Sequence, residues 1–126
     1  YGIGTRVYIA VLDEASLIKA ANLVTVYQPL PKFPAVVRDI SMLVSEKIYV
    51  RDIEKIIEAN GAPLIEDIEL FDVYQGGQIE KGSKSVSFSI TFRDGSKTLV
   101  DDEVNAVMSK ILAALERQFG AVLRDK

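Results

Sequence analysis

Hydroxyl and cationic side chains alternate with apolar ones over residues 85–93, and they are the groups in this chain best suited to binding a polar partner. The apolar positions are Val86, Phe88, Ile90 and Phe92, and the polar positions between them are Ser85, Ser87, Ser89, Thr91 and Arg93. A period of two predicts a β-strand with one face in the core and the other face open. The open face then presents a row of hydroxyls that ends in a cation.

The chain lacks the residue types that most often carry out catalysis. The chain has no histidine and no cysteine, so it lacks the commonest general base, the commonest metal ligand and any thiolate nucleophile. The carboxylates that remain are not spaced to meet in pairs beside a nucleophile, and Asp101 and Asp102 are explained by a position in the first turn of a helix. We therefore expect no catalytic residue, no metal site and no cofactor site in this chain.

Composition limits the class of protein. The chain has 126 residues, of which 48% are hydrophobic, which is enough for one domain with a sizeable core. No apolar stretch is long enough to cross a bilayer and no signal peptide is evident, so we expect a cytoplasmic protein without a membrane contact. A net charge of −3 argues against indiscriminate nucleic-acid binding but leaves room for a local basic patch. Because the chain opens on Tyr1, we expect it to be a piece excised from a longer protein.

The pattern of elements from residue 36 onward predicts the fold. Hydrophobic periodicity and turn residues predict, in order, a strand at 36–45, a helix at 51–60, strands at 65–74 and 86–93, a helix at 102–119 and a short strand at 121–124. Adjacent Leu70 and Phe71 predict a β-bulge near Asp72. The order β-α-β-β-α-β with right-handed crossovers predicts a ferredoxin-like α+β sandwich, in which a four-stranded antiparallel sheet carries both helices on one face.

The first part of the chain has a different character. Residues 6–12 are apolar on both alternating sets, which predicts a strand covered on both faces. Asp13 can cap a short helix that runs to about Asn22. Closely spaced prolines then favour a stiff, extended connector. We expect residues 1–26 to form a strand-helix appendage, 27–35 a proline-rich connector and 36–126 the main domain.

The open face of the sheet is the predicted contact surface. Phosphates and ribose accept hydrogen bonds from hydroxyls and cations, and Phe88 and Phe92 point into the core, unlike the exposed aromatics of an RNA-recognition sheet. Ser41 should join the hydroxyl row from the neighbouring strand. The candidate RNA-binding residues are Arg38, Ser41, Lys84, Ser87, Ser89, Thr91, Arg93 and Lys97.

Four segments of the sequence resemble a known family. They are FPAVVRDISMLV (33–44), LFDVYQGGQIEKGSKSVSFSITFRD (70–94), TLVDDEVN (98–105) and GAVLR (120–124). Their order and spacing resemble the ferredoxin-fold anticodon-binding domain that ends the β subunit of bacterial phenylalanyl-tRNA synthetase. Residues 5–22 resemble the strand and helix that finish the domain preceding it.

That resemblance implies a role that composition does not reach. It implies contact with the anticodon stem-loop of the phenylalanine tRNA, and a parent enzyme that is an α2β2 assembly using ATP, magnesium and phenylalanine. In the family, aminoacylation takes place on the α subunit, so the resemblance implies no catalysis by this fragment.

Two other functions fit the same topology. A ligand-sensing regulatory domain would bind a small molecule at a dimer interface, with glycine-rich loops between strands and helices, whereas Gly61 and Gly120 follow helices. An acylphosphatase-like enzyme would need a phosphate-cradling loop after its first strand, and residues 45–52 contain no glycine. The sensing domain remains the alternative hypothesis.

Overall fold

The computed structural model describes residues 2, 4–22, 24, 27, 29–77 and 79–124. The chain divides into two compact units, Tyr1–Leu30 and Pro31–Lys126. None of the helices in the described part of the chain is both long enough and apolar enough to span a membrane.

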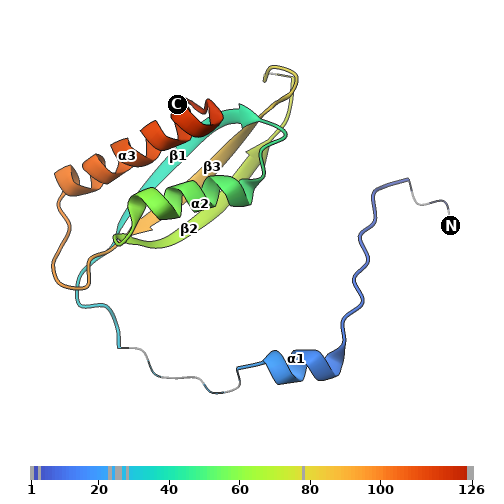
Figure 1. Ribbon diagram of the computed structural model, residues 1–126, viewed down its shortest axis with the longest axis horizontal. Coiled ribbons are helices and arrows are strands. Elements are labelled where there is room, and N and C mark those ends of the chain that lie inside the picture. The colour runs from blue at the N-terminus through green and yellow to red at the C-terminus, as the bar shows by residue number, and fades with distance from the viewer. Residues whose placement is uncertain are drawn as a thin grey trace. The chain divides into compact units, whose positions relative to one another are not determined.

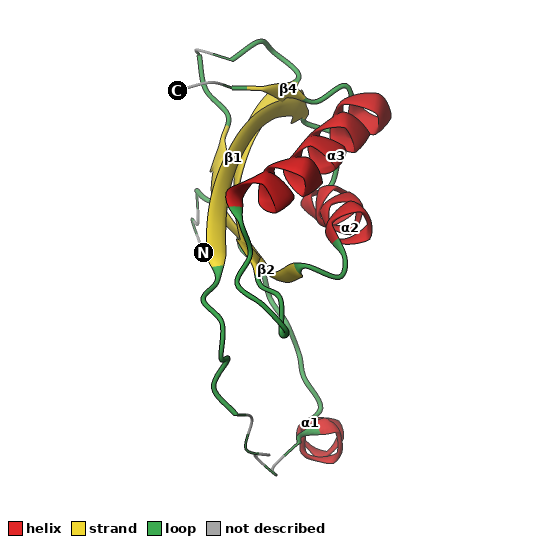
Figure 2. Cartoon of the chain, turned by 90° about the vertical axis from the view of Figure 1, so that its left-hand side faces the viewer, coloured by secondary structure: helices red, strands yellow, loops and turns green. Residues whose placement is uncertain are grey.

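In the second unit, the residues that the structure describes form a four-stranded sheet and two helices. Its elements are β1 (Val36–Ser45), α2 (Val50–Gly61), β2 (Ile65–Tyr74), β3 (Ser83–Phe92), α3 (Asp101–Phe119) and β4 (Val122–Leu123). The strands lie in the order β2-β3-β1-β4 and every neighbouring pair is antiparallel. Both helices pack on one side of this sheet (Figures 1 and 2). The predicted ferredoxin-like β-α-β-β-α-β sandwich is therefore confirmed.

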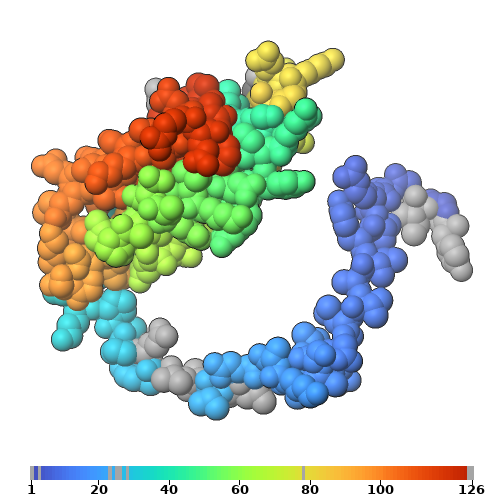
Figure 3. All heavy atoms as spheres, viewed as in Figure 1, coloured from blue at the N-terminus to red at the C-terminus, as the bar shows by residue number. Residues whose placement is uncertain are grey.

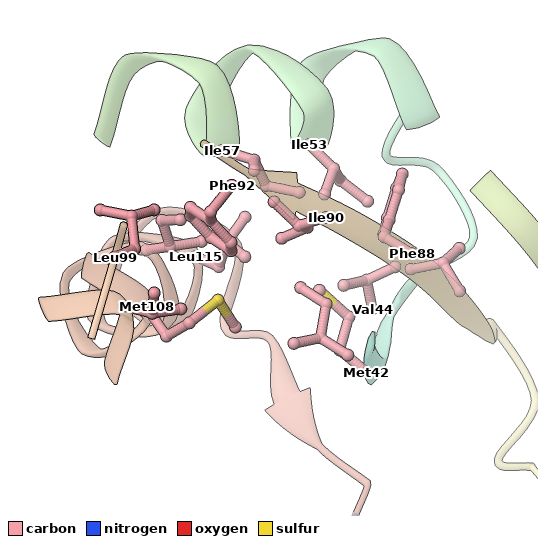
Figure 4. Packing of buried hydrophobic residues seen from close by; sticks show 14 residues of the cluster. Met42, Val44, Ile53, Ile57, Phe88, Ile90, Phe92, Leu99, Met108 and Leu115 are labelled. Carbon is pink, nitrogen blue, oxygen red and sulfur yellow. The ribbon is translucent and has the colours of Figure 1, made fainter. Parts of the chain in front are cut away.

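Alternation along the strands separates core from surface. Val86, Phe88, Ile90 and Phe92 of β3 are fully buried, and the helix-facing residues of β1 meet them across the sheet, as Ile40 does opposite Phe88. Helix α2 contributes Ile53 and Ile57 to the same core, and α3 contributes Met108 and Leu115 (Figure 4). In the space-filling view, α2 and α3 form most of the surface over the sheet (Figure 3).

Helix α3 ends and begins at residues whose types explain its limits. Gly120 takes the left-handed conformation at the C-terminus, with φ of 61°, where a residue with a Cβ would be strained. At the N-terminus Val100 occupies the capping position and cannot accept a hydrogen bond through its side chain. Instead the Glu103 carboxylate accepts from the Val100 N–H, at 3.3 Å.

The strand β2 departs from regular pairing at two places. Its register against β3 shifts between Ile65 and Asp67 and again between Leu70 and Asp72. The second shift is the bulge predicted near Asp72. Because a bulge adds one residue to one strand, it changes which side chains face the core. Leu70 and Val73 lie opposite the core residues Phe88 and Val86, with both Phe71 and Asp72 between them.

Among its described residues, the first unit contains one helix, α1 (Glu14–Ala20), whose N-terminus is capped by the Asp13 carboxylate accepting from the Ser16 N–H at 2.8 Å. The predicted strand at residues 6–12 is not formed: these residues belong to no strand. An extended segment becomes a strand only when another strand pairs with it, and the described part of this unit contains no second strand. The predicted helix is confirmed, although it ends at Ala20 and not near Asn22.

Candidate nucleic-acid interface

The side of the sheet without helices, called the open face here, is defined by the strand register. Strands β1, β2 and β3 supply side chains to it, and each residue of β3 from 85 to 92 lies between one residue of β1 and one of β2. From β1 the open face receives Val37, Asp39, Ser41 and Leu43, from β3 it receives Ser85, Ser87, Ser89 and Thr91, and from β2 it receives Asp67, Glu69, Asp72 and Tyr74.

The hydroxyl row lies at the centre of the open face. Ser41 lies opposite Ser87, and their two Oγ atoms are 2.9 Å apart. Ser85 and Ser87 are buried by their neighbours, while Ser89 and Thr91 are partly exposed. The structure therefore gathers Ser41, Ser87, Ser89 and Thr91 of the candidate set onto one surface.

Carboxylates flank this hydroxyl row on both sides. Ser89 lies between Asp39 and Glu69, Ser87 has Asp72 on its β2 side, and Thr91 has Asp67 there. All of these carboxylates are exposed. Such side chains only accept hydrogen bonds when ionised. The open face is therefore anionic, contrary to the sequence-based expectation of a face bordered by cations.

A hollow of about 660 Å³ lies on the open face where β1, β2 and β3 meet. Arg124, which follows β4, contributes a cation to the hollow, and Phe71, in the bulge of β2, contributes an aromatic ring. Its lining residues are Asp39, Ser41, Phe71, Asp72, Ser85, Ser87 and Arg124. Phe71 and Tyr74 are 53% and 41% exposed, so this side of the sheet offers aromatic surface after all.

Two of the four candidate cations lie on the helix-covered side. Arg38 lies opposite Ile90, which belongs to the core, and its guanidinium forms an ion pair with Asp101 at 2.5 Å. Lys84 is only 8% exposed, and its Nζ donates to the Ile48 carbonyl at 2.5 Å. Both side chains are therefore directed away from the open face.

The other two candidate cations lie beyond the end of β3 and are also engaged. The Arg93 guanidinium contacts Glu66 and the Phe33 carbonyl. Lys97 donates to the Glu103 carboxylate, and this contact lowers the pKa of Glu103, with a further contribution from the Val100 N–H, and raises the pKa of Lys97. The structure thus brings the candidate hydroxyls together and ties each candidate cation to a partner within the domain.

Among the residues that the structure describes, no cluster of three or more aspartate and glutamate side chains is arranged to hold a metal ion. The open face can accept hydrogen bonds through carboxylates and hydroxyls, and it can stack flat rings on aromatic side chains.

A family model for the ferredoxin-fold anticodon binding domain matches residues 31–124. The chain belongs to this family.

Three curated relatives of this anticodon-binding domain carry the same name. The chain is 49% identical over 124 residues to a phenylalanine–tRNA ligase beta subunit of Clostridium tetani, covering 98% of this chain and 16% of the relative. It is 44% identical over 117 residues to the beta subunit of Geobacillus kaustophilus and 38% identical over 117 residues to that of Bacillus subtilis, covering 93% of this chain and 15% of the relative in each case. The chain therefore spans about a sixth of the length of these relatives.

Sequence reasoning overlooked the acidic and aromatic part of this domain's open face. The signal for Asp39 was present, because it alternates with Ile40 and lies two residues before Ser41. The residues of β2 gave a weaker signal, since the bulge between Leu70 and Asp72 breaks the period of two. Tyr74 reaches the open face only because of that break.

Proposed function

We propose that this chain is the tRNA-binding module of a phenylalanine–tRNA ligase beta subunit and that it binds the anticodon stem-loop of the phenylalanine tRNA. The observation that carries the proposal is the match of residues 31–124 to the anticodon-binding family, together with the name shared by its relatives. An α subunit would complete an α2β2 enzyme that consumes ATP with magnesium in the cytoplasm.

The open face supports a particular mode of binding. Carboxylates repel phosphates, but they accept hydrogen bonds from the amino and imino groups of unpaired bases. Anticodon bases are single-stranded, and proteins read such bases along their edges while stacking them on aromatic rings. The exposed Phe71 supplies the aromatic ring, and the exposed carboxylates of Asp39 and Asp72 supply the acceptors for base edges. The proposed face therefore reads bases, and phosphates are contacted elsewhere or not at all.

In the ligase, the work of this domain is positioning. It holds the anticodon end of the tRNA while the chemical step takes place on another subunit, so its loss raises the KM for tRNA and leaves amino-acid activation unchanged. Binding by the isolated chain should be weak, since the other parts of the enzyme contribute further contacts.

The test uses two serines that differ in position but receive the same change. Ser89 lies on the open face, whereas Ser109 lies on the exposed side of α3. Ser89→Glu should weaken binding of the 126-residue chain to a phenylalanine anticodon stem-loop about tenfold, because a new carboxylate intrudes where the RNA docks. Ser109→Glu should leave affinity within about twofold. Equal effects of the two variants, or no binding by the unaltered chain, would reject the proposal.

A melting-temperature measurement with added phenylalanine tests the ligand-sensing alternative. A ligand-sensing domain would respond to a free amino acid with a rise in melting temperature, because a ligand that binds only the native state stabilises it. A thermal shift with phenylalanine and no RNA binding would replace the tRNA-binding proposal with that alternative.

A further inference from the structure

The guanidinium of Arg93 joins three segments that are distant in sequence. Its Nε lies 2.9 Å from each carboxylate oxygen of Glu66, at the start of β2. Its NH1 group donates to the backbone carbonyl of Phe33, in the connector that precedes β1. The backbone N–H of Arg93 donates to the Leu64 carbonyl at 2.9 Å, which fixes the position from which the side chain extends.

The partly buried setting of these contacts makes them effective. The Arg93 side chain is 24% exposed and that of Glu66 is 39% exposed, so water competes for the guanidinium only in part. A guanidinium presents its donors in one rigid plane, and it can therefore bind a carboxylate along one edge and a carbonyl along another. A lysine ammonium in the same place has no such planar fork.

The connector is prepared for this contact by its own sequence. Lys32 and Phe33 form a bend, and Pro34 restricts Phe33 before any partner binds it, because a following proline disfavours the helical region. The Phe33 side chain is partly buried. A carbonyl with a preset direction loses little conformational freedom when Arg93 binds it.

We propose that Arg93 is a positioning residue that fastens the connector at Phe33 to the adjoining ends of β2 and β3. Any reorientation of the preceding chain relative to the domain then has to take place before Phe33. If the proposed function holds, this fastening sets the direction that the open face presents to the tRNA in the ligase. Arg93 accordingly serves the domain through the connector and makes no phosphate contact.

Limited proteolysis of the 126-residue chain tests the fastening directly. Trypsin cleaves after Lys32, and cleavage requires the connector around Phe33 to detach from the domain by local unfolding. Because such cleavage follows the population of the opened form, Arg93→Gln should accelerate it about tenfold, which corresponds to the loss of a hydrogen bond to a charged group. Glu66→Gln should have a smaller effect in the same direction, and Arg93→Lys should restore protection only in part.

Lys97→Gln is the matched control. It removes one cation, one trypsin site and one ion pair at the other end of the loop after β3, and cleavage after Lys32 should be unchanged. Cleavage after Lys110, within α3, reports global unfolding and should stay the same in all variants. A rate after Lys32 in Arg93→Gln within about twofold of the unaltered chain overturns the proposal.

RNA titration separates this proposal from the proposed function. Arg93→Gln should leave both the affinity of the isolated chain for the stem-loop and its salt dependence unaltered. A fall in the log–log salt slope of about 0.7, the value of one phosphate contact on a single strand, would show that Arg93 binds phosphate and would overturn the positioning role. If the unaltered chain fails to bind RNA at all, the proposed function fails, while the proteolysis result still decides the fastening.

Discussion

The hydroxyl oxygens of Ser41 and Ser87 lie 2.9 Å apart, and this contact joins β1 to β3 at the centre of the open face. One hydroxyl donates to the other, and either direction is compatible with the geometry. The acceptor's own proton remains available to a ligand. A small, adaptable hydrogen-bonding group is thus held at the base of the hollow that Asp39 and Asp72 border.

This pair should show a measurable coupling in stability. Ser41→Ala, Ser87→Ala and the double variant form a cycle, and urea unfolding should give an interaction free energy of about 0.5–1 kcal/mol, which is typical of hydroxyl pairs across strands. The alanines keep the β-sheet intact, since they remove only the oxygen atoms. Additive effects within about 0.3 kcal/mol would show that the two hydroxyls do not interact in solution.

The sign of a charge effect distinguishes base reading from phosphate contact. Asp39→Asn and Asp72→Asn each remove a negative charge from the open face. If these carboxylates accept hydrogen bonds from bases, each variant should weaken stem-loop binding about tenfold, equivalent to about 1.4 kcal/mol. If the face meets phosphates instead, both variants should bind more tightly.

The control for these variants is Asp102→Asn, which removes the same charge from the exposed first turn of α3. It should change the affinity less than about twofold. An equal effect of all three variants would indicate a response to net charge alone.

The fold could be predicted from the sequence because its signals are local. The alternation from Val86 to Phe92 and the apolar stripe that includes Val104, Met108 and Ile111 each determine an element and its buried side. The bulge near Asp72 was also readable, from two adjacent apolar residues. The absence of a strand at residues 6–12 could not be predicted in this way, because a strand depends on a partner strand as well as on its own pattern.

The candidate site was less accessible to sequence reasoning. Lys84 has the same parity as Val86, and Arg38 has the same parity as Ile40, so strand alternation already directs both side chains toward the helices. A charged side chain can nevertheless lie beside a core, because long side chains can bury their stems. Their partners, Ile48 and Asp101, are 36 and 63 residues away, and the local sequence does not predict such long-range contacts.

Ile111 tests the packing of α3 on the sheet. Its side chain extends from α3 into the hydrophobic core and is fully buried there. Ile111→Ala should lower the free energy of unfolding by about 2–5 kcal/mol, because it removes buried methyl groups and leaves a cavity. Lys110→Ala, on the exposed side of the same helix, should change it by less than about 0.5 kcal/mol. Denaturant titration measures both, and a loss below about 1 kcal/mol for Ile111→Ala would contradict this packing.

Glu103 should contribute to the dependence of stability on pH. Its pKa lies below the ordinary value of 4.5, because Lys97 and the Val100 N–H stabilise the charged form. A lowered pKa in the folded state means that the contribution is fully present above about pH 4.5 and is lost as the pH falls through the folded-state pKa. The stability difference between the unaltered chain and Glu103→Gln should therefore shrink on acidification. A difference that stays constant from pH 7 to pH 3 would contradict the assignment.

The last prediction concerns residues 1–26, which we propose belong with a preceding domain, with residues 27–35 as the connector and 36–126 as the anticodon-binding domain. The segment 6–12 is apolar on both sides, and Ile9 and Val11 are 87% and 95% exposed. Exposed apolar surface of this kind promotes association. All residues of the buried hydrophobic cluster, by contrast, lie at position 40 or later.

A chain trimmed to begin at Tyr27 should therefore keep the melting temperature of the domain while associating less with itself. Circular dichroism melts measure the first quantity, and analytical ultracentrifugation over a range of concentrations measures the second. As a control, the full-length variant Ile9→Ser with Val11→Ser should reproduce the reduced association without shortening the chain, since it removes apolar surface and retains the length. If the trimmed chain melts at a lower temperature, residues 1–26 support this domain directly. If neither solubility nor association changes, the segment does not carry a surface that requires a neighbouring domain.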